Sequence, residues 1–245
     1  MSFSSINRDE IAKIKIPLPP LDVQQKILDE IEIVEQNEEA SQKDIEHREQ
    51  LLKKQEYFRY TERRIGDISV MAKRGKSAKY GNSSIQVIKS GQARGYLEFD
   101  FSERHYVSQE FVLDERKLKK GDILINSTGV GTAGRVTLFD LDGDFVVDSH
   151  ITIVRLDRKQ AIPKYVLYAL ANIGFKQIEA MADGQSGQIE LQLDTILGIR
   201  IPLPSFDAQQ RIVAEIEQHE MEMNRLRDRL DKLKEEKSVI LKKYL

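Results

Sequence analysis

The stretch IPLPPLDVQQKI at residues 16–27 returns almost unchanged as IPLPSFDAQQRI at residues 201–212. The two copies are identical at 8 of 12 positions and lie 185 residues apart. Solenoid repeats have periods of roughly 20 to 50 residues, so this offset is too long for a solenoid. The chain therefore contains one structural unit twice, with a domain-sized segment between the copies.

Each copy predicts an extended segment that leads into a helix. The prolines of Ile-Pro-Leu-Pro fix φ and remove backbone donors, so this segment cannot be helical. Asp22 is followed by Gln25, and Asp207 by Gln210, with the same spacing. Asp-x-x-Gln is a variant of the capping box, in which the acid caps the first helical turn. We therefore expect helices to begin at about residues 22 and 207.

Apolar residues recur in both predicted helices at alternating steps of four and three. This spacing is the heptad pattern of a coiled coil. Because apolar stripes of this length must be covered, we expect the two helices to pair as an antiparallel coiled coil. The seam positions are Ile27, Ile31, Val34, Ile212, Ile216, Met223, Leu226, Leu230 and Leu233.

The segment between the helices predicts a mixed α and β domain. Short β-branched runs alternate with glycine-containing turns, and a helix opens at Pro163 and ends near residue 183. We expect strands at 65–70, 85–88, 96–101, 122–126, 135–139 and 145–156, and an exposed polar loop at 185–190. The predicted class is α+β, with one mixed α/β domain flanked by the two long helices. Its expected parts are a stub at 1–21, a first helix at 22–58, the domain at 59–205 and a second helix at 206–245.

Composition is that of a soluble chain without covalent cross-links. Cysteine is absent, which is compatible with a reducing cytoplasm. No apolar run approaches the 18 residues of a membrane span, so we expect no membrane contact. The net charge of −2 conceals a basic segment at 59–94, which has 9 basic residues against 2 acidic ones. An excess of this kind is typical of a surface that binds phosphates.

Two motifs suggest ligands, and each has a simpler explanation. GVGTAG at 129–134 satisfies the dinucleotide pattern G-x-G-x-x-G, but the alternating RVTLFD after it predicts a strand instead of a phosphate-binding helix. Asp140, Asp142 and Asp144 suggest calcium, although a hairpin turn at 142–143 explains them better. The four histidines show no metal spacing, and His150 is most simply a core or loop residue. No catalytic constellation stands out.

Taken in order, several stretches make the chain resemble the specificity subunits of type I restriction-modification systems. The stretches are RRIGDI at 63–68, LKKGDILINSTG at 118–129, ADGQSGQIELQLDTILGIRIPLP at 182–204 and the two repeat copies. The resemblance covers essentially the whole chain. A full specificity subunit has two recognition domains, each followed by a helix, so this chain resembles a half-type subunit with a single target recognition domain.

The resemblance implies a non-catalytic reader of double-stranded DNA. It also implies partners: restriction (R) subunits, and methyltransferase (M) subunits that bind S-adenosylmethionine and use the paired helices as a subunit interface. Because one recognition domain reads only one half-site, we expect a second copy of this chain in a homodimer. No cofactor is expected in this chain. The alternatives are a coiled-coil scaffold that binds protein without DNA specificity, and an enzyme fused to a recognition domain, for which the allocated residues leave no room.

The residues themselves suggest which side chains contact DNA. Phosphate contacts position a protein and base contacts specify the sequence, with arginine and glutamine able to grip guanine and adenine bidentately. We expect phosphate contacts from Lys73, Arg74, Lys76 and Lys79. We expect base contacts from Gln92, Arg94, Ser127, Thr128, Gln185 and Gln188. We expect Tyr80 either to stack on a base or to lie along the DNA backbone.

Overall fold

The computed structural model describes residues 17–52, 58–185 and 188–244. Its contacts divide the chain into two units. Among the described residues, the helical unit comprises 17–52 and 217–244, and the middle domain comprises 58–185 and 188–216. No helix in the described ranges is long and apolar enough to cross a membrane.

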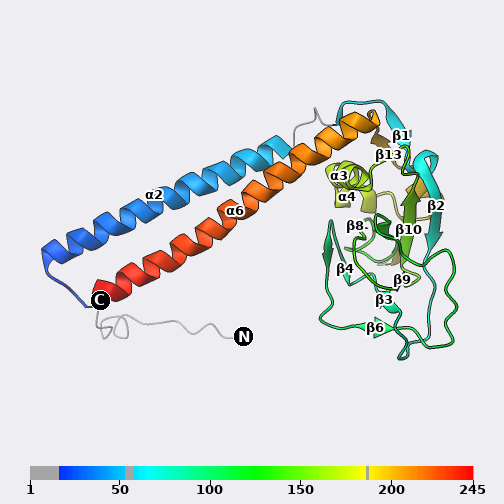
Figure 1. Cartoon of the computed structure of the whole chain (residues 1–245), viewed down its shortest axis with the longest axis horizontal. Helices are drawn as coiled ribbons and strands as arrows, with labels where there is room; N and C mark the ends of the chain where they lie inside the picture. The colour runs from blue at the N-terminus through cyan, green and yellow to red at the C-terminus, as the bar shows by residue number, and fades with distance from the viewer. Residues whose placement is uncertain (1–16, 53–57, 186–187, 245) are drawn as a thin grey trace. The chain divides into compact units, whose positions relative to one another are not determined.

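The helical unit consists of α2 (Leu21–Leu52) and the greater part of α6 (Phe206–Tyr244). The two helices run antiparallel, so that the end of α6 lies beside the start of α2 (Figure 1). Lys243 Nζ lies 3.2 Å from Glu30 Oε1, and Arg227 Nη2 lies 3.5 Å from Glu49 Oε1. The predicted antiparallel coiled coil is confirmed. The first helix was predicted to extend to residue 58. The structure describes α2 as far as Leu52, and residues 53–57 are outside the described residues.

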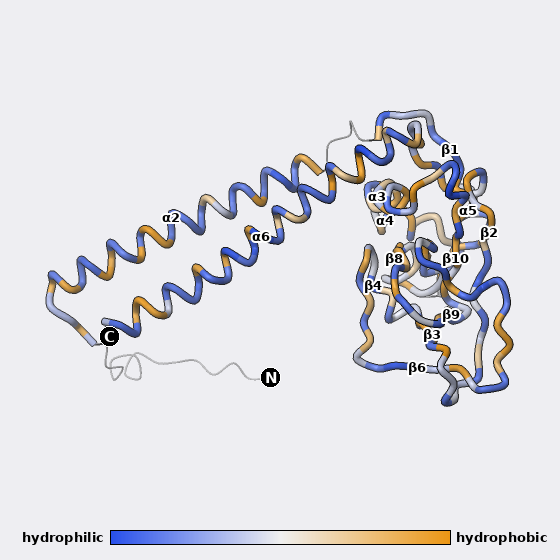
Figure 2. Tube along the Cα trace, viewed as in Figure 1, coloured by the Kyte–Doolittle hydropathy of each residue, from blue (hydrophilic) through white to orange (hydrophobic). Residues whose placement is uncertain are grey.

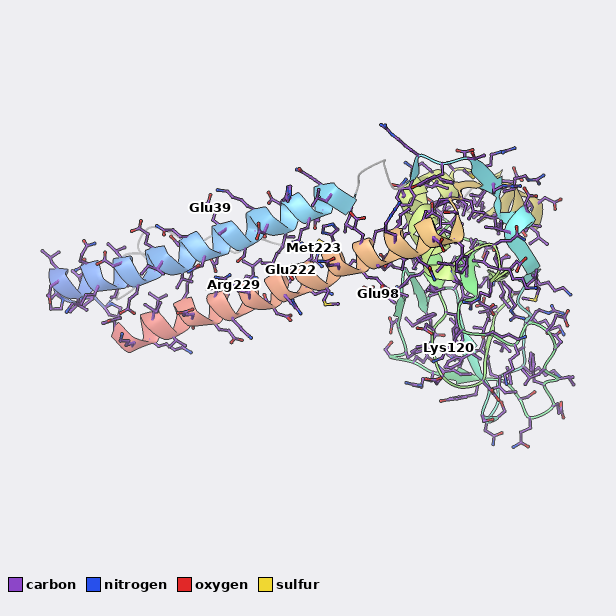
Figure 3. The ribbon with its side chains drawn as sticks, turned by 45° about the horizontal axis from the view of Figure 1, so that its top comes forward. Glu39, Glu98, Lys120, Glu222, Met223 and Arg229 are labelled. Atoms are coloured by element: carbon purple, nitrogen blue, oxygen red, sulfur yellow. The ribbon has the colours of Figure 1, made fainter. Side chains whose placement is uncertain are left out.

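The heptad seam is buried between the two helices of the same chain. Val34, Leu233 and Ile240 form a cluster, against which Ile31 packs. The other buried apolar seam residues described in this unit are Ile27, Ile45, Met223 and Leu226, and Ser41 is buried with them. Apolar positions recur at intervals along both helices (Figure 2), while charged side chains such as Glu39, Glu222 and Arg229 line them (Figure 3). Ile212 and Ile216 are also buried, but they belong to the middle domain.

The starts of both helices differ from the predicted capping box. α2 begins at Leu21 and α6 at Phe206, so Asp22 and Asp207 lie in the first turn and do not precede it. In the second copy the Ser205 hydroxyl accepts a hydrogen bond from Ala208 N (3.4 Å), which is the capping role predicted for Asp207. Gln25 donates to Asp29 farther along the helix and does not reach back.

The middle domain is built around an antiparallel four-stranded sheet in the order β2-β10-β7-β8. Its strands are β2 (Ser69–Arg74), β10 (Ile151–Leu156), β7 (Ile123–Asn126) and β8 (Val136–Leu138). β7 and β8 are buried throughout, as is nearly all of β10, which matches their β-branched composition. A second sheet, β6-β3-β9, comprises β6 (His105–Tyr106), β3 (Gln86–Ile88) and β9 (Phe145–Val147). An apolar core that includes Leu124, Phe139 and Ile153 joins the two sheets.

Three two-stranded ladders complete the domain. They pair β1 (Glu62–Arg64) with β13 (Arg200–Pro202), β4 (Ala93–Gly95) with β5 (Glu98–Phe99), and β11 (Asp183–Gln185) with β12 (Gln188–Glu190). The extended conformation predicted for the second repeat copy is thus confirmed by β13. The helices of the domain are α3 (Pro163–Ile173), α4 (Phe175–Glu179) and α5 (Leu193–Gly198).

Several sequence predictions for this domain were wrong in detail. Residues 65–68 form a 3-10 helix where a strand was expected, and 145–156 is two strands separated by a turn. The helix after Pro163 is interrupted at Gly174, whose φ of 95° is unfavourable for other residues. Residues 183–185 and 188–190 form the paired strands β11 and β12, and Glu190 also bridges to Thr128, so the polar loop predicted at 185–190 is in its described part a strand pair.

Candidate nucleic-acid interface

Four strand ends of the central sheet meet at one edge of the middle domain. The antiparallel register pairs Thr152 with Arg74, Ile151 with Asn126, and Ile125 with Val136. The end of β2, the end of β7 and the starts of β8 and β10 therefore lie together. We call this the loop edge and define it by Arg74, residues 126–135 and residues 148–151. Loops held on such a rigid frame are common binding sites.

The glycine-rich segment 129–134 connects β7 to β8 and forms the centre of the loop edge. No helix comes after it before β8, so the dinucleotide interpretation is wrong and the predicted loop between strands is confirmed. Thr132 Oγ1 donates to Thr128 O (2.8 Å), and Gly131 N donates to the Glu179 carboxylate. A side chain at Gly134 would meet Glu179 N at 2.7 Å. The loop is thus packed closely against α4 and fixed in shape.

The hairpin β11–β12 is attached directly to this loop. Thr128 forms a β-bridge with Glu190, and Leu191 N donates to Ser127 O (2.8 Å). Arg74 Nη2 lies 2.8 Å from Glu190 Oε1 and donates to Leu191 O at 2.6 Å. The backbone therefore brings together three parts that the sequence indicates separately, namely Arg74, Thr128 and the hairpin that carries Gln185 and Gln188. The side chains of these two glutamines are outside what the structure describes.

His150 is a part of the loop edge that sequence analysis did not identify. Its exposed ring shares a hydrogen bond of 2.7 Å between Nδ1 and Thr128 Oγ1. Its backbone N donates to Asp148 Oδ1 (2.9 Å), while Ser90 N donates to Asp148 Oδ2 (3.3 Å). Burial of the Asp148 carboxyl raises its pKa above the usual value. His150 was expected in a core or a loop, and the structure places it in a loop beside Thr128, 22 residues away in the sequence.

Three of the four predicted phosphate-binding cations already have carboxylate partners. Lys73 pairs with Glu115, Arg74 with Glu190, and Lys76 with Asp114. The hydrogen bond from Lys76, supported by the backbone and side chain of Arg116, lowers the pKa of Asp114 to about 2. These acids come from segments about 40 or more residues away in the sequence. In the folded chain they partly neutralise the positive charge of residues 59–94. Lys79 is exposed, and no ion pair involves it in the described part of the chain.

Two of the predicted base-reading side chains lie inside the fold. Ser127 is fully buried and shares a 2.6 Å hydrogen bond with Thr152 Oγ1. The buried Gln92 accepts from Lys89 N at 2.9 Å and donates to Glu103 O at 2.5 Å, which shapes the turn at 89–92. Because these groups are already satisfied, both have a structural role in this conformation. Sequence alone did not indicate this, since the partners are set by tertiary structure.

Arg94 and Tyr80 remain accessible beside this edge. Arg94 Nη2 donates to Asp100 Oδ2 at 2.7 Å, and half of its side chain is exposed. The exposed Tyr80 ring lies 5.4 Å from the His105 ring, and Lys89 Nζ lies 5.3 Å from its centroid. Within the described residues no group of three or more histidines and acids is placed to hold a metal ion. The arrangement offers hydrogen-bond donors, acceptors and cations for recognition.

Comparison with solved structures shows which class of protein has this fold. The HsdS subunit from Thermoanaerobacter tengcongensis aligns over 99% of this chain and 63% of its own, with a TM-score of 0.64 and 18% identity. The type I restriction-modification S subunit from M. genitalium aligns over 99% of this chain and 67% of its own, with a TM-score of 0.56 and 15% identity. The fold is therefore that of type I specificity subunits.

Sequence comparison then identifies the family. Residues 59–235 match the model of the type I restriction modification DNA specificity domain, and the chain belongs to that family. A Haemophilus influenzae protein named as a putative type I restriction enzyme specificity subunit is 26% identical over 244 residues. The match covers 93% of this chain and 61% of that protein.

Proposed function

We propose that the chain recognises DNA sequence for a type I restriction-modification complex without carrying chemistry of its own. The observation that supports this most directly is the convergence of Arg74, Thr128, His150 and the hairpin β11–β12 on the loop edge. These groups include hydrogen-bond donors and acceptors of the kind that read base edges, and a cation beside them. They are held by a packed sheet, so little ordering entropy is lost on binding.

The partners of this function are those that the family implies. Methyl transfer, with S-adenosylmethionine as the donor, would belong to methyltransferase subunits, and DNA cleavage to restriction subunits. The helical unit would be their platform, because its exposed faces are rich in charged side chains while its apolar seam is already buried. Such a complex would act on DNA in the cytoplasm.

Equilibrium binding to duplex DNA tests the proposal. Changing Lys73, Arg74, Lys76 and Lys79 together to Ala should weaken binding to all sequences and flatten its dependence on salt. Each lost phosphate contact removes about 0.9 from the slope of log K against log salt. A wild-type chain that shows no salt-dependent binding would contradict the proposal and favour a coiled-coil scaffold that binds only protein.

We also propose that two chains form a homodimer through one end of the helical unit. Exposed apolar side chains gather where α2 begins and α6 ends, including Leu18 (83% exposed), Leu21 (81% exposed) and Val239 (63% exposed). A second copy of the same surface is a suitable cover, because two-fold contacts are self-complementary. One recognition domain per chain would then read two identical half-sites, giving an interrupted palindrome.

Sedimentation tests the homodimer directly. Leu28, 59% exposed, lies two turns after Leu21 in α2. The wild-type chain of 28.2 kDa should sediment at twice that mass, and the Leu21→Lys/Leu28→Lys double variant as a monomer. Val70 is similarly exposed but lies in the middle domain, so Val70→Lys is the matched control and should remain dimeric. A wild-type chain that stays monomeric at high concentration would rule out this assembly.

A further inference from the structure

Arg135 is a half-buried cation without an acidic partner. It directly precedes β8, and its guanidinium donates only to carbonyl oxygens, with Nη1 at 3.4 Å from Ala93 O and Nη2 at 3.2 Å from Gly131 O. In the described ranges no carboxylate lies within ion-pair distance of it. By contrast, the partly buried Arg116 and Arg155 each pair with a carboxylate. Carbonyl dipoles do not neutralise a full charge, so Arg135 retains an unmet attraction for an anion.

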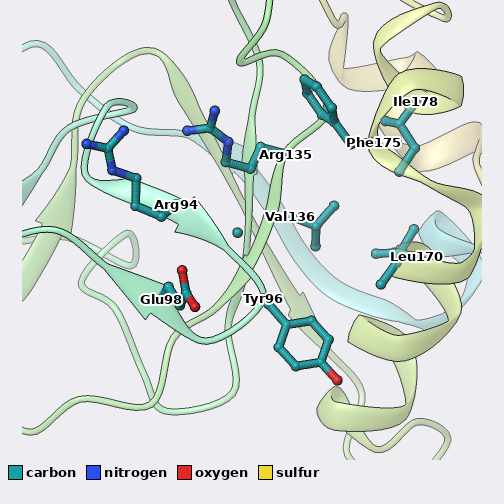
Figure 4. Close-up of a pocket in the computed structure, with 11 residues that line it drawn as sticks. Arg94, Tyr96, Glu98, Arg135, Val136, Leu170, Phe175 and Ile178 are labelled. Atoms are coloured by element: carbon teal, nitrogen blue, oxygen red, sulfur yellow. The ribbon is translucent and has the colours of Figure 1, made fainter. Parts of the chain in front are cut away.

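A pocket of about 550 Å³ opens beside this guanidinium. Arg94 and Arg135 reach out together along one side of it, and apolar side chains face them from the other side (Figure 4). The apolar side is formed by Leu170, Phe175 and Ile178. Glu98 also lines the pocket. Arg94 is paired with Asp100, whereas the described residues give Arg135 no ion pair, so Arg135 is the arginine of the two that has no carboxylate partner.

Backbone geometry holds the two arginines at a fixed spacing. A Cβ at Gly95, whose φ is 104°, would lie 3.2 Å from Arg135 Cγ, so the stem of Arg135 lies across this glycine. Next to it, Tyr96 has a φ of 58°, which is unfavourable for a tyrosine. Tyr96 N donates to Val136 O and Leu138 N to Tyr96 O, each at 2.7 Å, and these bonds keep the hairpin β4–β5 on β8. Strain that is held in this way is typical of binding sites.

We propose that Arg135, with Arg94 beside it, binds a phosphate of the DNA backbone at the mouth of this pocket. This inference rests on the proposed function and identifies the contact that would set the register of the loop edge on the duplex. The bond from Arg135 to Gly131 O places the guanidinium against the glycine loop. No atom lies within 4 Å of a Cβ added at Gly131, so a backbone phosphate could approach there. Phosphate contacts position a protein while nearby groups read bases.

Charge variants of Arg135 in the full chain test the proposal. Binding to a mixed-sequence duplex would be followed by fluorescence anisotropy between about 50 and 200 mM salt. Arg135→Gln should reduce the log-log slope by about 0.9, whereas Arg135→Lys, which keeps the charge but loses the fork of carbonyl bonds, should keep the slope. Lys159→Gln, on an exposed turn of the same domain, is the control and should leave it unchanged. A slope unaffected by Arg135→Gln would overturn the inference and leave the proposed function standing; a wild-type chain that binds no duplex would overturn both.

Chemical protection of the wild-type chain provides a second measurement that does not depend on how the variants fold. Phenylglyoxal modifies accessible guanidinium groups, and peptide mass spectrometry reports the extent at Arg135. Duplex DNA should protect Arg135 more than it protects Arg158, an exposed arginine elsewhere in the domain. Equal modification with and without duplex would overturn the inference. Protection by polyglutamate but not by duplex would also overturn it, and would assign the pocket to an acidic protein partner.

Discussion

At the scale of single residues, the loop edge is organised around a partly buried acid. Asp148 accepts hydrogen bonds from Ser90 N and His150 N, and so joins the turn at 89–92 to the turn between β9 and β10. Burial disfavours the charged form more than these bonds favour it, and the pKa of Asp148 is therefore raised. The hydrogen bond from His150 N to Asp148 holds His150 in place, while partial burial of the Asp148 carboxylate has an unfavourable desolvation free energy.

This balance predicts how stability depends on pH. Because the pKa of Asp148 is higher in the folded chain than its ordinary value of 3.8, the folded state retains a proton that the unfolded state has lost. The contribution of Asp148 to stability should therefore fall as the pH rises from about 3.8 through the folded pKa, so the melting temperature of Asp148→Asn should rise relative to that of the wild type over this window. Melting temperatures of both proteins, measured from about one pH unit below to about three units above the ordinary pKa of aspartate, provide the comparison. A difference between them that does not change with pH would contradict the raised pKa.

Sequence analysis identified the region of the loop edge better than the individual residues that form it. Thr128, Arg74 and the segment around Gln185 were recognised from residue type alone, and the structure brings them together. Ser127 has the same chemistry as Thr128, but strand alternation and the bond to Thr152 turn it inward. The acids that pair with cations of the basic segment come from a distant loop, which no local pattern reports. The sequence gives no sign that the arginine after the glycine loop lacks an acidic partner, because that depends on the tertiary contacts around it.

At the scale of elements, the two repeat copies share a glutamine with different surroundings. Gln24 and Gln209 occupy equivalent positions, and each amide donates to the proline carbonyl five residues earlier, at 2.7 Å in the first copy and 3.0 Å in the second. Gln209 is fully buried, donates also to Gln160 O and accepts from Ile162 N. The glutamine of the repeat therefore bonds to the start of its helix in both copies. In the second copy it also bonds to Gln160 and Ile162 of the middle domain.

Replacing each glutamine separates these two roles. Gln209→Ala should destabilise the middle domain by about 1–3 kcal/mol, because it leaves Ile162 N and two carbonyls unsatisfied in a buried site. Gln24→Ala loses one half-exposed bond at the equivalent position and should cost no more than about 0.5 kcal/mol. Urea denaturation measures both. Equal losses in the two variants would show that the contacts with Gln160 and Ile162 contribute nothing.

The coiled coil offers an equally close comparison of neighbouring positions. Val34 is 3% exposed and packs against Leu233 and Ile240, whereas Ile33 next to it is 61% exposed. Val34→Asp would bury an unpaired carboxylate at a cost of several kcal/mol, and should lower the helical circular dichroism and its melting temperature. Ile33→Asp should change neither by much. Similar behaviour of the two variants would contradict the heptad assignment.

The heptad pattern was predictable because it repeats, while the helix starts were not. A heptad pattern over many turns remains recognisable when single seam positions are polar. Ser41 is such a position: it is buried in the seam and donates to Asn37 O of its own helix. A cap depends on a single residue, and the choice between Ser205 and Asp207 was decided by where the prolines end the extended segment. The short pieces of the middle domain, such as the 3-10 helix at Ile65–Ile68, are too brief to show a period.

At the scale of the whole molecule, the repeat links sequence reading to assembly. One copy joins the middle domain to α6, and the other begins α2 at the exposed apolar end of the helical unit. In a complex built on these two features, the middle domain would recognise the DNA sequence. The helices would bind the other subunits and set the distance between the two recognition domains. The spacing between two half-sites would then depend on helix length.

Under the proposed function, the middle domain determines which DNA sequence the complex acts on. The most direct test is to co-express the chain with type I methyltransferase subunits and map methylated sites across a genome, for the wild type and for Thr128→Ala combined with His150→Ala. We expect one interrupted palindrome for the wild type. For the double variant we expect the same motif with one position relaxed, and this position should be the same in both half-sites. Methylation at an asymmetric two-part site would contradict the symmetric assembly. Methylation at identical sites with the wild type, with the double variant and without the chain would contradict DNA recognition itself.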